Sequence, residues 1–189
     1  DENEVLDMLH TARSLGTPVA VRYPRGAGEG VKIEAERKCL KVGQARLLSQ
    51  GQDLAILAIG RAVTIGRDVA SILLNEGIAA KLVDARFVKP LDEALICDLG
   101  RKYQRMLTIE DNCLAGGFGS AVLEVLEDNS IKTEVLRIGI PDEFVEHGNV
   151  EVLFNYLNMD PESIAETLIN KWPDLLDNGT WGMRKIGKN

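Results

Sequence analysis

Histidine and cysteine, the side chains that most often bind transition metals, are scarce in this sequence. Among its 189 residues are two histidines, His10 and His147, and three cysteines, Cys39, Cys97 and Cys113. The histidines stand far apart, and no two cysteines have the CxxC spacing of a zinc site, so the pattern argues against a transition-metal centre. Because the cysteines are also odd in number, we expect reduced thiols and a cytoplasmic protein.

An excess of positive charge and a long apolar run are missing as well. Lysine and arginine number 22 against 29 aspartates and glutamates, which gives a formal net charge of −7. This balance argues against a general nucleic-acid-binding surface. No run of about 18 apolar residues occurs, and the opening residues 1–4 are acidic rather than basic, so we expect neither a membrane span nor a signal peptide.

What is present is an ordinary globular composition with a regular pattern. The hydrophobic fraction is 45%, which is typical of a packed core. Apolar runs alternate with segments of helical periodicity from residue 44 onwards, which predicts an α/β domain, doubly wound, with a mostly parallel sheet. The expected strands are 45–49, 54–59, 78–84, 105–110 and 133–140, and the expected helices are 63–76, 91–103, 120–127, 150–157 and 161–172.

A different pattern precedes this domain. Glu4–Leu15 has the periodicity of an amphipathic helix, and Pro18–Tyr23 reads as an apolar strand. A single αβ unit cannot bury its own faces, so we interpret it as the remnant of a preceding domain. The residues expected on the apolar face of the helix are Val5, Leu6, Leu9, Ala12 and Leu15.

Composition also suggests where these parts begin and end. Glycines followed by charged residues without clear periodicity are typical of a domain boundary. The chain thins out into glycine, asparagine and lysine at its end, which is typical of a surface extension. The expected divisions are a remnant at 1–26, a linker at 27–43, a complete domain at 44–173 and a tail at 174–189.

Two arginines and several glycines follow the expected strand, in the stretch Arg22–Gly30. Pro24 fixes its own φ, and the glycines allow the backbone to bend where a side chain would obstruct it. A guanidinium group binds carboxylate or phosphate through two parallel hydrogen bonds. Arg22 and Arg25 are therefore candidates for an anion site at a strand end, and the alternative is a solvated loop with two ordinary surface arginines.

A second candidate for an anion site is the glycine-rich turn Gly116–Ser120, which leads into an expected helix. Free backbone amides at a helix N-terminus favour phosphate or carboxylate groups. However, Val122 replaces the third glycine of the dinucleotide-binding pattern, and Glu110 and Asp111 would repel an anion. We favour a tight turn with close packing of helix against strand.

Two more polar segments follow expected strands. Asp84–Asp92 contains a possible internal ion pair, and Asp92 can serve the N-terminus of the next helix. We expect structural work there, or contact with a partner domain, rather than catalysis. Asp142–His147 combines three acids with a histidine, and His147 can be considered as a general base. No nucleophile or metal ligand accompanies it, so we interpret it as incidental.

Several of these segments occur in a specific order: Ala20–Gly26, Leu82–Ile96, Thr108–Asn112 with Gly116–Ser120, and Ile138–Asp142. In that order they resemble the C-terminal third of the 1-deoxy-D-xylulose-5-phosphate synthase family, within the transketolase superfamily. The resemblance covers about residues 1–172, and its most specific part is Arg86–Asp92. It implies a transketolase C-terminal domain from about residue 40, preceded by the end of a pyrimidine-binding domain.

The resemblance also implies an activity. Members of this family use thiamine diphosphate and Mg²⁺ to condense pyruvate with glyceraldehyde 3-phosphate, with loss of CO2, to 1-deoxy-D-xylulose 5-phosphate. This compound feeds the synthesis of isoprenoid precursors, thiamine and pyridoxal. The family is homodimeric, which implies a dimer that also packs against the N-terminal domains.

Residue by residue, the resemblance transfers one function to this chain. Arg25 matches the arginine that holds the phosphate of glyceraldehyde 3-phosphate, and Arg22 is then expected to be a structural partner of the strand end. The family's cofactor-binding, metal-binding and catalytic residues lie upstream of the matched region. The resemblance therefore places none of them in this chain and implies that the chain alone is inactive.

Two alternatives remain open from the sequence. The first is another transketolase-type enzyme, such as the beta subunit of a 2-oxo acid dehydrogenase, which passes its product to a lipoyl group instead of a phosphorylated aldehyde. The second is a non-catalytic module, in which the turn Gly116–Ser120 and the acidic surface recognise a ligand or partner protein.

Overall fold

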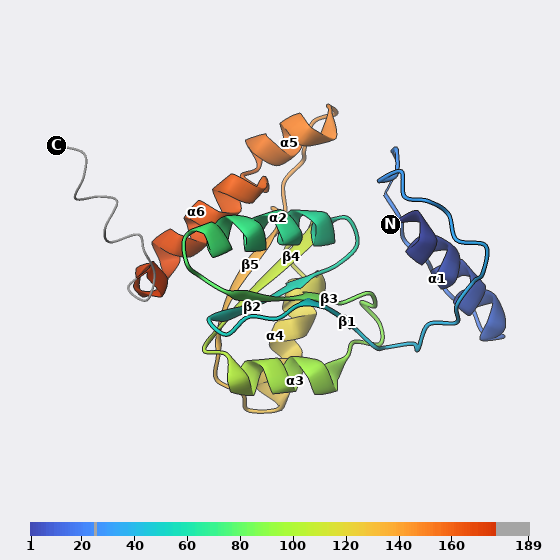
Figure 1. The fold of residues 1–189 in the computed structure, drawn as a ribbon, viewed down its shortest axis with the longest axis horizontal. Coiled ribbons are helices and arrows are strands. Elements are labelled where there is room, and N and C mark those ends of the chain that lie inside the picture. The colour runs from blue at the N-terminus through green and yellow to red at the C-terminus, as the bar shows by residue number, and fades with distance from the viewer. Residues whose placement is uncertain (25, 177–189) are drawn as a thin grey trace.

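A five-stranded sheet with helices on both faces forms the centre of the computed structural model, which describes residues 1–24 and 26–176 (Figure 1). The strands are β1 (Arg46–Ser49), β2 (Leu54–Ala58), β3 (Ala80–Asp84), β4 (Arg105–Cys113) and β5 (Glu134–Ile140). The helices are α1 (Glu2–Ser14), α2 (Ala62–Asn75), α3 (Glu93–Lys102), α4 (Phe118–Asp128), α5 (Val150–Tyr156), α6 (Pro161–Lys171) and the short 3-10 helix η1 (Pro173–Leu176). Every described helix is too short or too polar to cross a membrane.

The sheet has the order β1-β3-β2-β4-β5. Strands β3, β2, β4 and β5 are parallel, and β1 pairs antiparallel with β3 at one edge. The predicted α/β class with a mostly parallel sheet is confirmed. From β2 the chain continues to β3 on one side, whereas from β4 it continues to β5 on the other. The winding therefore reverses between β2 and β4, and the carboxyl ends of strands at such a reversal form the usual ligand crevice of these sheets.

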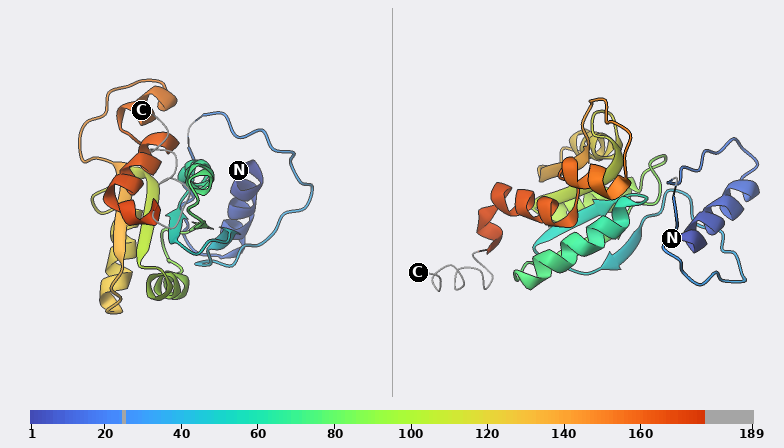
Figure 2. Two further views of the ribbon diagram at one scale, coloured as in Figure 1. Left: turned by 60° about the vertical axis from the view of Figure 1, so that its left-hand side comes forward. Right: turned by 90° about the horizontal axis from the view of Figure 1, so that it is seen from above.

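Two apolar cores lie on opposite faces of the sheet. Helices α2 and α6 cover one face, and α3 and α4 cover the other (Figures 1 and 2). Strand β2 supplies both cores, because Leu54 and Ile56 point towards α2 and α6 while Ala55 and Leu57 point towards α3 and α4. All five residues of β2 are buried, as expected for a central strand with helices on both faces.

Helix α1 lies beside the sheet domain, on the side away from α6 (Figure 1). The expected helix is confirmed, and the apolar face expected for it is largely exposed. Leu6, Leu9 and Leu15 are exposed, and the buried residues are Asp7 and Thr11. The polar face of α1 is the one that makes contacts, because its side chains form hydrogen bonds with backbone groups of residues 30–40.

Hydrogen bonds from this segment explain the orientation of α1. Backbone N–H groups of Glu34, Lys38 and Leu40 donate in turn to the side-chain oxygens of Asn3, Asp7 and Thr11, at 2.9, 3.0 and 2.8 Å. Residues four apart lie on one side of a helix, so one stripe of α1 satisfies amides along an extended chain that has no strand beside it. Backbone amides that are removed from water need hydrogen-bond partners. Providing these partners decides which face of α1 packs against the chain, and the leucines stay exposed.

The predicted strand Pro18–Tyr23 is wrong, because these residues form neither strand nor helix. A strand requires a neighbouring strand to pair its backbone groups, and none of the five strands runs alongside this segment (Figure 1). Of the αβ unit expected at residues 1–26, the helix is therefore formed and the strand is not. The segment reaches the sheet through the side chain of Arg22.

Candidate functional site

Arg25, the residue expected to bind a substrate phosphate, lies outside the described residues. Its neighbours on both sides are described, and their contacts locate the loop relative to the sheet domain. Arg22 contacts β4 and Glu29 contacts α2. The site described below is therefore the carboxyl end of the sheet together with the loop segments on either side of Arg25.

Arg22 forms a two-point contact with Asp111, near the carboxyl end of β4. Its Nη1 atom donates to Oδ1 of Asp111 at 2.8 Å, and its Nη2 atom donates to the backbone carbonyl oxygen of Asp111 at 3.0 Å. Arg22 was expected to be a structural partner of the end of the strand Pro18–Tyr23, which is not formed; it pairs instead with a residue near the end of β4. A Cβ atom placed on Gly60, just after β2, would lie 3.9 Å from Oδ1 of Asp111. The contact therefore sits at the reversal between β2 and β4.

A second contact holds the loop after Arg25. The hydroxyl of Thr64, in the first turn of α2, donates to Oε1 of Glu29 at 2.6 Å. A carboxylate in this position is favoured by the N-terminal end of the helix dipole.

The backbone N–H of Gly30 also donates to Oε1 of Glu2 in α1, at 2.7 Å. This hydrogen bond lowers the pKa of the Glu2 carboxyl below its ordinary value. A Cβ atom on Gly28 would overlap the same carboxyl group, so only glycine fits there without rearrangement. The glycines of the loop thus let the chain pass close to α1.

Glu110 fills the N-terminus of α4. It is 1% exposed, and its Oε2 and Oε1 atoms accept hydrogen bonds from the backbone N–H groups of Phe118 and Gly119, at 2.7 and 2.8 Å. A Cβ atom on Gly117 would overlap Oε2 of Glu110, and one on Gly139 would lie 3.0 Å from its Cγ atom. Both glycines therefore make room for this carboxylate.

This arrangement decides between the two interpretations of the turn Gly116–Ser120. The predicted tight turn with close packing of helix against strand is confirmed. Glu110 disfavours an anion at the turn, as expected, and the structure adds that it does so by occupying the free amides itself. The two amides at the start of α4 are occupied by the chain's own side chain.

Ion pairs join α1 to the sheet domain. The Nε atom of Arg86 donates to Oε1 of Glu4 at 2.5 Å, and Nη2 of Arg46 donates to Oε2 of Glu4 and to Oδ2 of Asp84, at 3.1 Å each. The ion pair expected within Asp84–Asp92 is absent from the described contacts. Instead, Asp84 accepts from the backbone N–H of Arg86 at 3.0 Å.

Asp84 is the perturbed carboxyl of this cluster. Its pKa is raised from the ordinary value of 3.8 to about 6; burial is the largest cause, the charge of Glu4 acts in the same direction, and the charge of Arg46 opposes both. Burial disfavours the ionised form because water no longer solvates it, and a second carboxylate nearby acts in the same direction.

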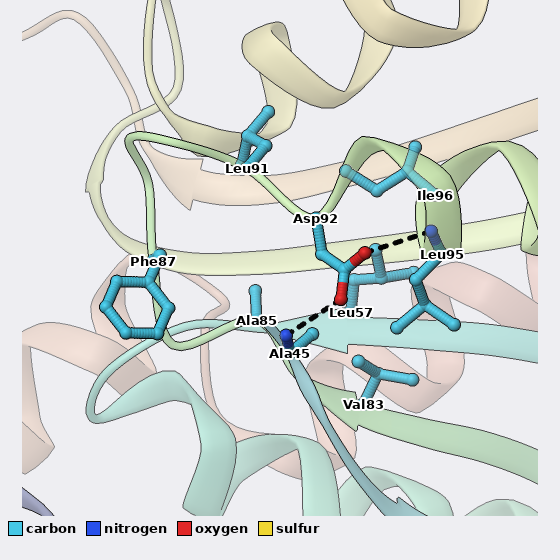
Figure 3. Close-up of a pocket in the computed structure, with 9 residues that line it drawn as sticks. All are labelled: Ala45, Leu57, Val83, Ala85, Phe87, Leu91, Asp92, Leu95 and Ile96. Carbon is cyan, nitrogen blue, oxygen red and sulfur yellow. Dashed lines mark hydrogen bonds between the residues drawn. The ribbon is translucent and has the colours of Figure 1, made fainter. Parts of the chain in front are cut away.

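Asp92 caps α3, as expected. Its Oδ1 atom accepts from the backbone N–H of Leu95 at 3.1 Å, and its Oδ2 atom accepts from Ala45, just before β1, at 2.9 Å (Figure 3). The cavity beside it, lined mostly by apolar side chains, measures about 10 Å³. This space is about that of one water molecule, so Asp92 has a structural role and no ligand fits beside it.

His147 lies in the exposed loop between β5 and α5. Among the described contacts it has neither a hydrogen bond nor an ion pair, and the described residues include no group of three His, Cys, Asp or Glu side chains that could hold a metal ion. The geometry therefore adds no partner to support His147 as a general base.

Sequence reasoning missed the partners of Asp111 and Glu4 because they lie far away along the chain. Arg22 and Asp111 are 89 positions apart, and Glu4 and Arg86 are 82 apart. Glu110 is different, because it lies only eight positions before Phe118. An acid near the end of a buried strand, followed by a glycine turn and a helix, is a local signal that could have revealed this cap.

Residues 43–164 match the family model described as transketolase, C-terminal domain. The chain is 57% identical over 190 positions to the 1-deoxy-D-xylulose-5-phosphate synthase of Syntrophomonas wolfei, covering 100% of this chain and 30% of that protein. It is 48% identical over 165 positions to the synthase of the same name from Heliobacterium modesticaldum, covering 87% and 26%. The chain therefore spans less than a third of the length of these curated relatives.

One solved structure is similar in both fold and sequence. It is a split-gene transketolase, described as an inactive beta4 tetramer, with a TM-score of 0.63 and 28% sequence identity. The similarity covers 76% of this chain and 45% of that one.

Proposed function

Since the chain belongs to the transketolase C-terminal domain family, we propose that it is the C-terminal part of a 1-deoxy-D-xylulose-5-phosphate synthase. The resemblance to this family that the sequence indicated is confirmed. The whole protein would condense pyruvate with glyceraldehyde 3-phosphate to 1-deoxy-D-xylulose 5-phosphate and release CO2. The observation that carries the proposal is the identity to the Syntrophomonas wolfei synthase along the full length of this chain.

In this proposal the chain combines parts of two domains. Residues 1–26 would end a pyrimidine-binding domain, 27–43 would link it to the next, and 44–173 would form the C-terminal domain. Residues 174–189 would be a tail, and of these 177–189 lie outside the described residues. The family match over 43–164 supports the boundary near residue 43. The full-length protein would act in the cytoplasm, which is consistent with the odd number of cysteines.

Thiamine diphosphate and Mg²⁺ are the cofactors that the proposal requires, and the described residues do not fit them. Free amides at the N-terminus of α4 could bind a diphosphate, but the Glu110 carboxylate already accepts their hydrogen bonds. A metal-binding group of acids is also lacking in the described residues. We therefore assign both cofactors to upstream segments and derive no chemical step in this chain from them.

The part that this chain plays is to bind substrate. Arg25 would pair with the phosphate of glyceraldehyde 3-phosphate through its guanidinium group. This phosphate is remote from the aldehyde carbon that reacts, so the binding energy would orient the aldehyde.

Assembly is part of the same proposal. The whole protein would be a homodimer, and this chain would pack against the N-terminal domains. Exposed leucines on α1 support such a contact, because apolar surface on a helix favours burial against a partner. The inactive beta4 tetramer of a split-gene transketolase supports the expectation that this chain alone is inactive.

The curated relatives favour the synthase over the beta subunit of a 2-oxo acid dehydrogenase, because they are named for the synthase. Occupation of the α4 N-terminus by Glu110 weighs against a ligand-binding module that uses the turn Gly116–Ser120.

The test measures CO2 release and 1-deoxy-D-xylulose 5-phosphate formation from pyruvate and glyceraldehyde 3-phosphate, with added thiamine diphosphate and Mg²⁺. We expect turnover by a protein that carries this chain behind upstream segments like those of its relatives, and none by residues 1–189 alone. An extended protein that is folded and binds thiamine diphosphate, yet makes no product, would overturn the proposal. Turnover by residues 1–189 alone would refute the assignment of catalysis to upstream segments.

A further inference from the structure

Helix α1 contacts the sheet domain through charged side chains rather than apolar ones. Among the described residues, neither apolar core includes a member of α1, and the helix lies beside the sheet domain (Figures 1 and 2). Glu4 reaches across from α1. Its Oε1 atom accepts from Nε of Arg86 at 2.5 Å, and its Oε2 atom accepts from Nη2 of Arg46 at 3.1 Å. One carboxylate therefore joins α1 to two arginines, one in β1 and one just after β3.

A second carboxyl group shares one of these arginines. The Nη2 atom of Arg46 also donates to Oδ2 of Asp84, at 3.1 Å, so Glu4 and Asp84 are neighbours around the same nitrogen. When it is neutral, the Asp84 carboxyl can donate a hydrogen bond to Glu4. The side chains of Glu4 and Asp84 are only 16% and 5% exposed. Solvent therefore screens them little, and each carboxyl group senses the charge of the other.

We propose that this cluster is a pH-sensitive latch, which holds α1 more tightly against the sheet domain in mildly acidic than in neutral solution. The latch consists of Glu4, Arg46, Asp84 and Arg86. With Asp84 neutral, Glu4 receives hydrogen bonds from both arginines and from the Asp84 carboxyl. With Asp84 ionised, two carboxylates repel each other and compete for Arg46. The inference depends on contacts within this chain and does not rest on the proposed function.

The direction of the effect agrees with the pKa of Asp84. This pKa is raised from 3.8 to about 6, first by burial and then by the charge of Glu4, while the charge of Arg46 opposes the rise. Detachment of α1 takes the charge of Glu4 away, so the pKa is lower in the detached state. The docked state therefore keeps a proton that the detached state releases. The resulting stabilisation is complete below the detached pKa and is lost as pH rises through about 6.

The other groups around Asp84 do not reverse this direction. Arg46 belongs to β1 and stays beside Asp84 whether or not α1 is docked. Arg86 donates its backbone N–H to Oδ1 of Asp84 at 3.0 Å, a contact within the sheet domain. On the other side, β2 places the uncharged Ala58 opposite Asp84. His10 is exposed farther along α1 and has no described contact with the latch.

Hydrogen exchange of the α1 amides measures the latch in residues 1–189, even if α1 detaches only rarely. A lone helix of 13 residues is marginal in water, so its amides exchange when α1 leaves the sheet domain. After correction for the intrinsic effect of pH, we expect protection factors in α1 to be about three to ten times larger at about pH 5 than at about pH 7.5. Amides of α6, which packs in an apolar core, are the internal reference.

Three variants separate the latch from other effects. Asp84→Asn keeps the shape of the side chain but cannot ionise, so protection of α1 should be equal at the two pH values. Glu4→Gln should lower the midpoint of the Asp84 carboxyl titration, followed by carbon-13 NMR, because a neighbouring negative charge is lost. The matched control is Glu34→Gln, which breaks an exposed ion pair with Lys38 and should leave both measurements as in wild type.

Three outcomes would overturn the inference. The first is wild-type protection of α1 that, relative to α6, is equal at the two pH values. The second is a pH dependence that persists in Asp84→Asn, which would assign it to another group such as His10. The third is an Asp84 midpoint that Glu4→Gln leaves unchanged, and this comparison decides if Asp84→Asn does not fold. None of these measurements uses enzyme activity, so an inactive full-length protein would refute the proposed function alone.

Discussion

Glu110 accepts a hydrogen bond at Oε2 from the backbone N–H of Phe118, at 2.7 Å, so a side chain of the sheet closes the first turn of α4. The second carboxylate oxygen takes the next amide, that of Gly119. A buried charge is stable only when hydrogen bonds replace its water. The contact therefore links helix and strand in a way that depends on the charge and shape of one residue.

Glu110→Gln is expected to lower the free energy of unfolding by about 2–4 kcal/mol. Glutamine keeps one acceptor oxygen, and its NH2 group would face a backbone N–H, which leaves that donor buried without a partner. Urea unfolding followed by circular dichroism measures the loss. Asp160→Asn is the control, since Asp160 caps α6 through the N–H of Ser163 and asparagine caps about as well. Equal losses in the two variants would contradict this account.

Gly116 and Gly117 are adjacent, but their substitution should have different consequences. Gly116 has a φ of 71° and open space around its missing side chain, so Gly116→Ala should cost about 1 kcal/mol of stability through backbone strain alone. A Cβ atom on Gly117 would overlap the carbonyl oxygen of Cys113 and the carboxylate of Glu110. Gly117→Ala should cost about 3 kcal/mol, the upper range for overpacking. Thermal unfolding of both variants tests this, and similar melting temperatures would refute it.

Asp84 should make stability depend on pH in an unusual direction for a carboxyl group. Its pKa rises from 3.8 to about 6 in the folded chain, so the folded state holds a proton that the unfolded state has released. The resulting stabilisation is complete below pH 3.8 and is lost as pH rises through about 6. Urea unfolding between these limits should show wild type losing stability relative to Asp84→Asn as pH increases. Parallel profiles for the two proteins would rule out this titration.

Arg25→Ala in the full-length enzyme should reduce kcat/KM for glyceraldehyde 3-phosphate by a factor that corresponds to roughly 2–4 kcal/mol. The physical reason is loss of a charge-assisted contact with the phosphate. Steady-state kinetics with both substrates provide the measurement. Arg13→Ala, at an exposed position in the last turn of α1, is the matched control and should behave as wild type. An unchanged kcat/KM in Arg25→Ala would remove the substrate-binding role.

Local signals were enough to predict most of the sheet domain. The apolar run of β2 and the start of α6, with Asp160 before Pro161, both have causes within a few residues. The wrong expectation concerns the strand Pro18–Tyr23. It depended on a partner that sequence periodicity cannot identify, because a strand needs a neighbouring strand to pair its backbone groups.

In the candidate site, too, features that depend on distant partners could not be predicted from the sequence. A structural role for Arg22 followed only from the family resemblance, and Asp111 as its partner, 89 positions away, was not predictable from the sequence. The cap formed by Glu110 was not predicted, because sequence alone does not tell whether a nearby acid faces a helix N-terminus or merely precedes it. Arg25 as a phosphate ligand stays a prediction.

The closed first turn of α4 has a consequence for regulation. The Glu110 carboxylate is tethered to the amides it binds, so its effective concentration there is on the order of millimolar or higher. A free nucleotide or metabolite phosphate would have to displace this internal competitor and leave a buried carboxylate unpaired. The turn is therefore shielded from changes in the concentration of free phosphate and of phosphorylated metabolites.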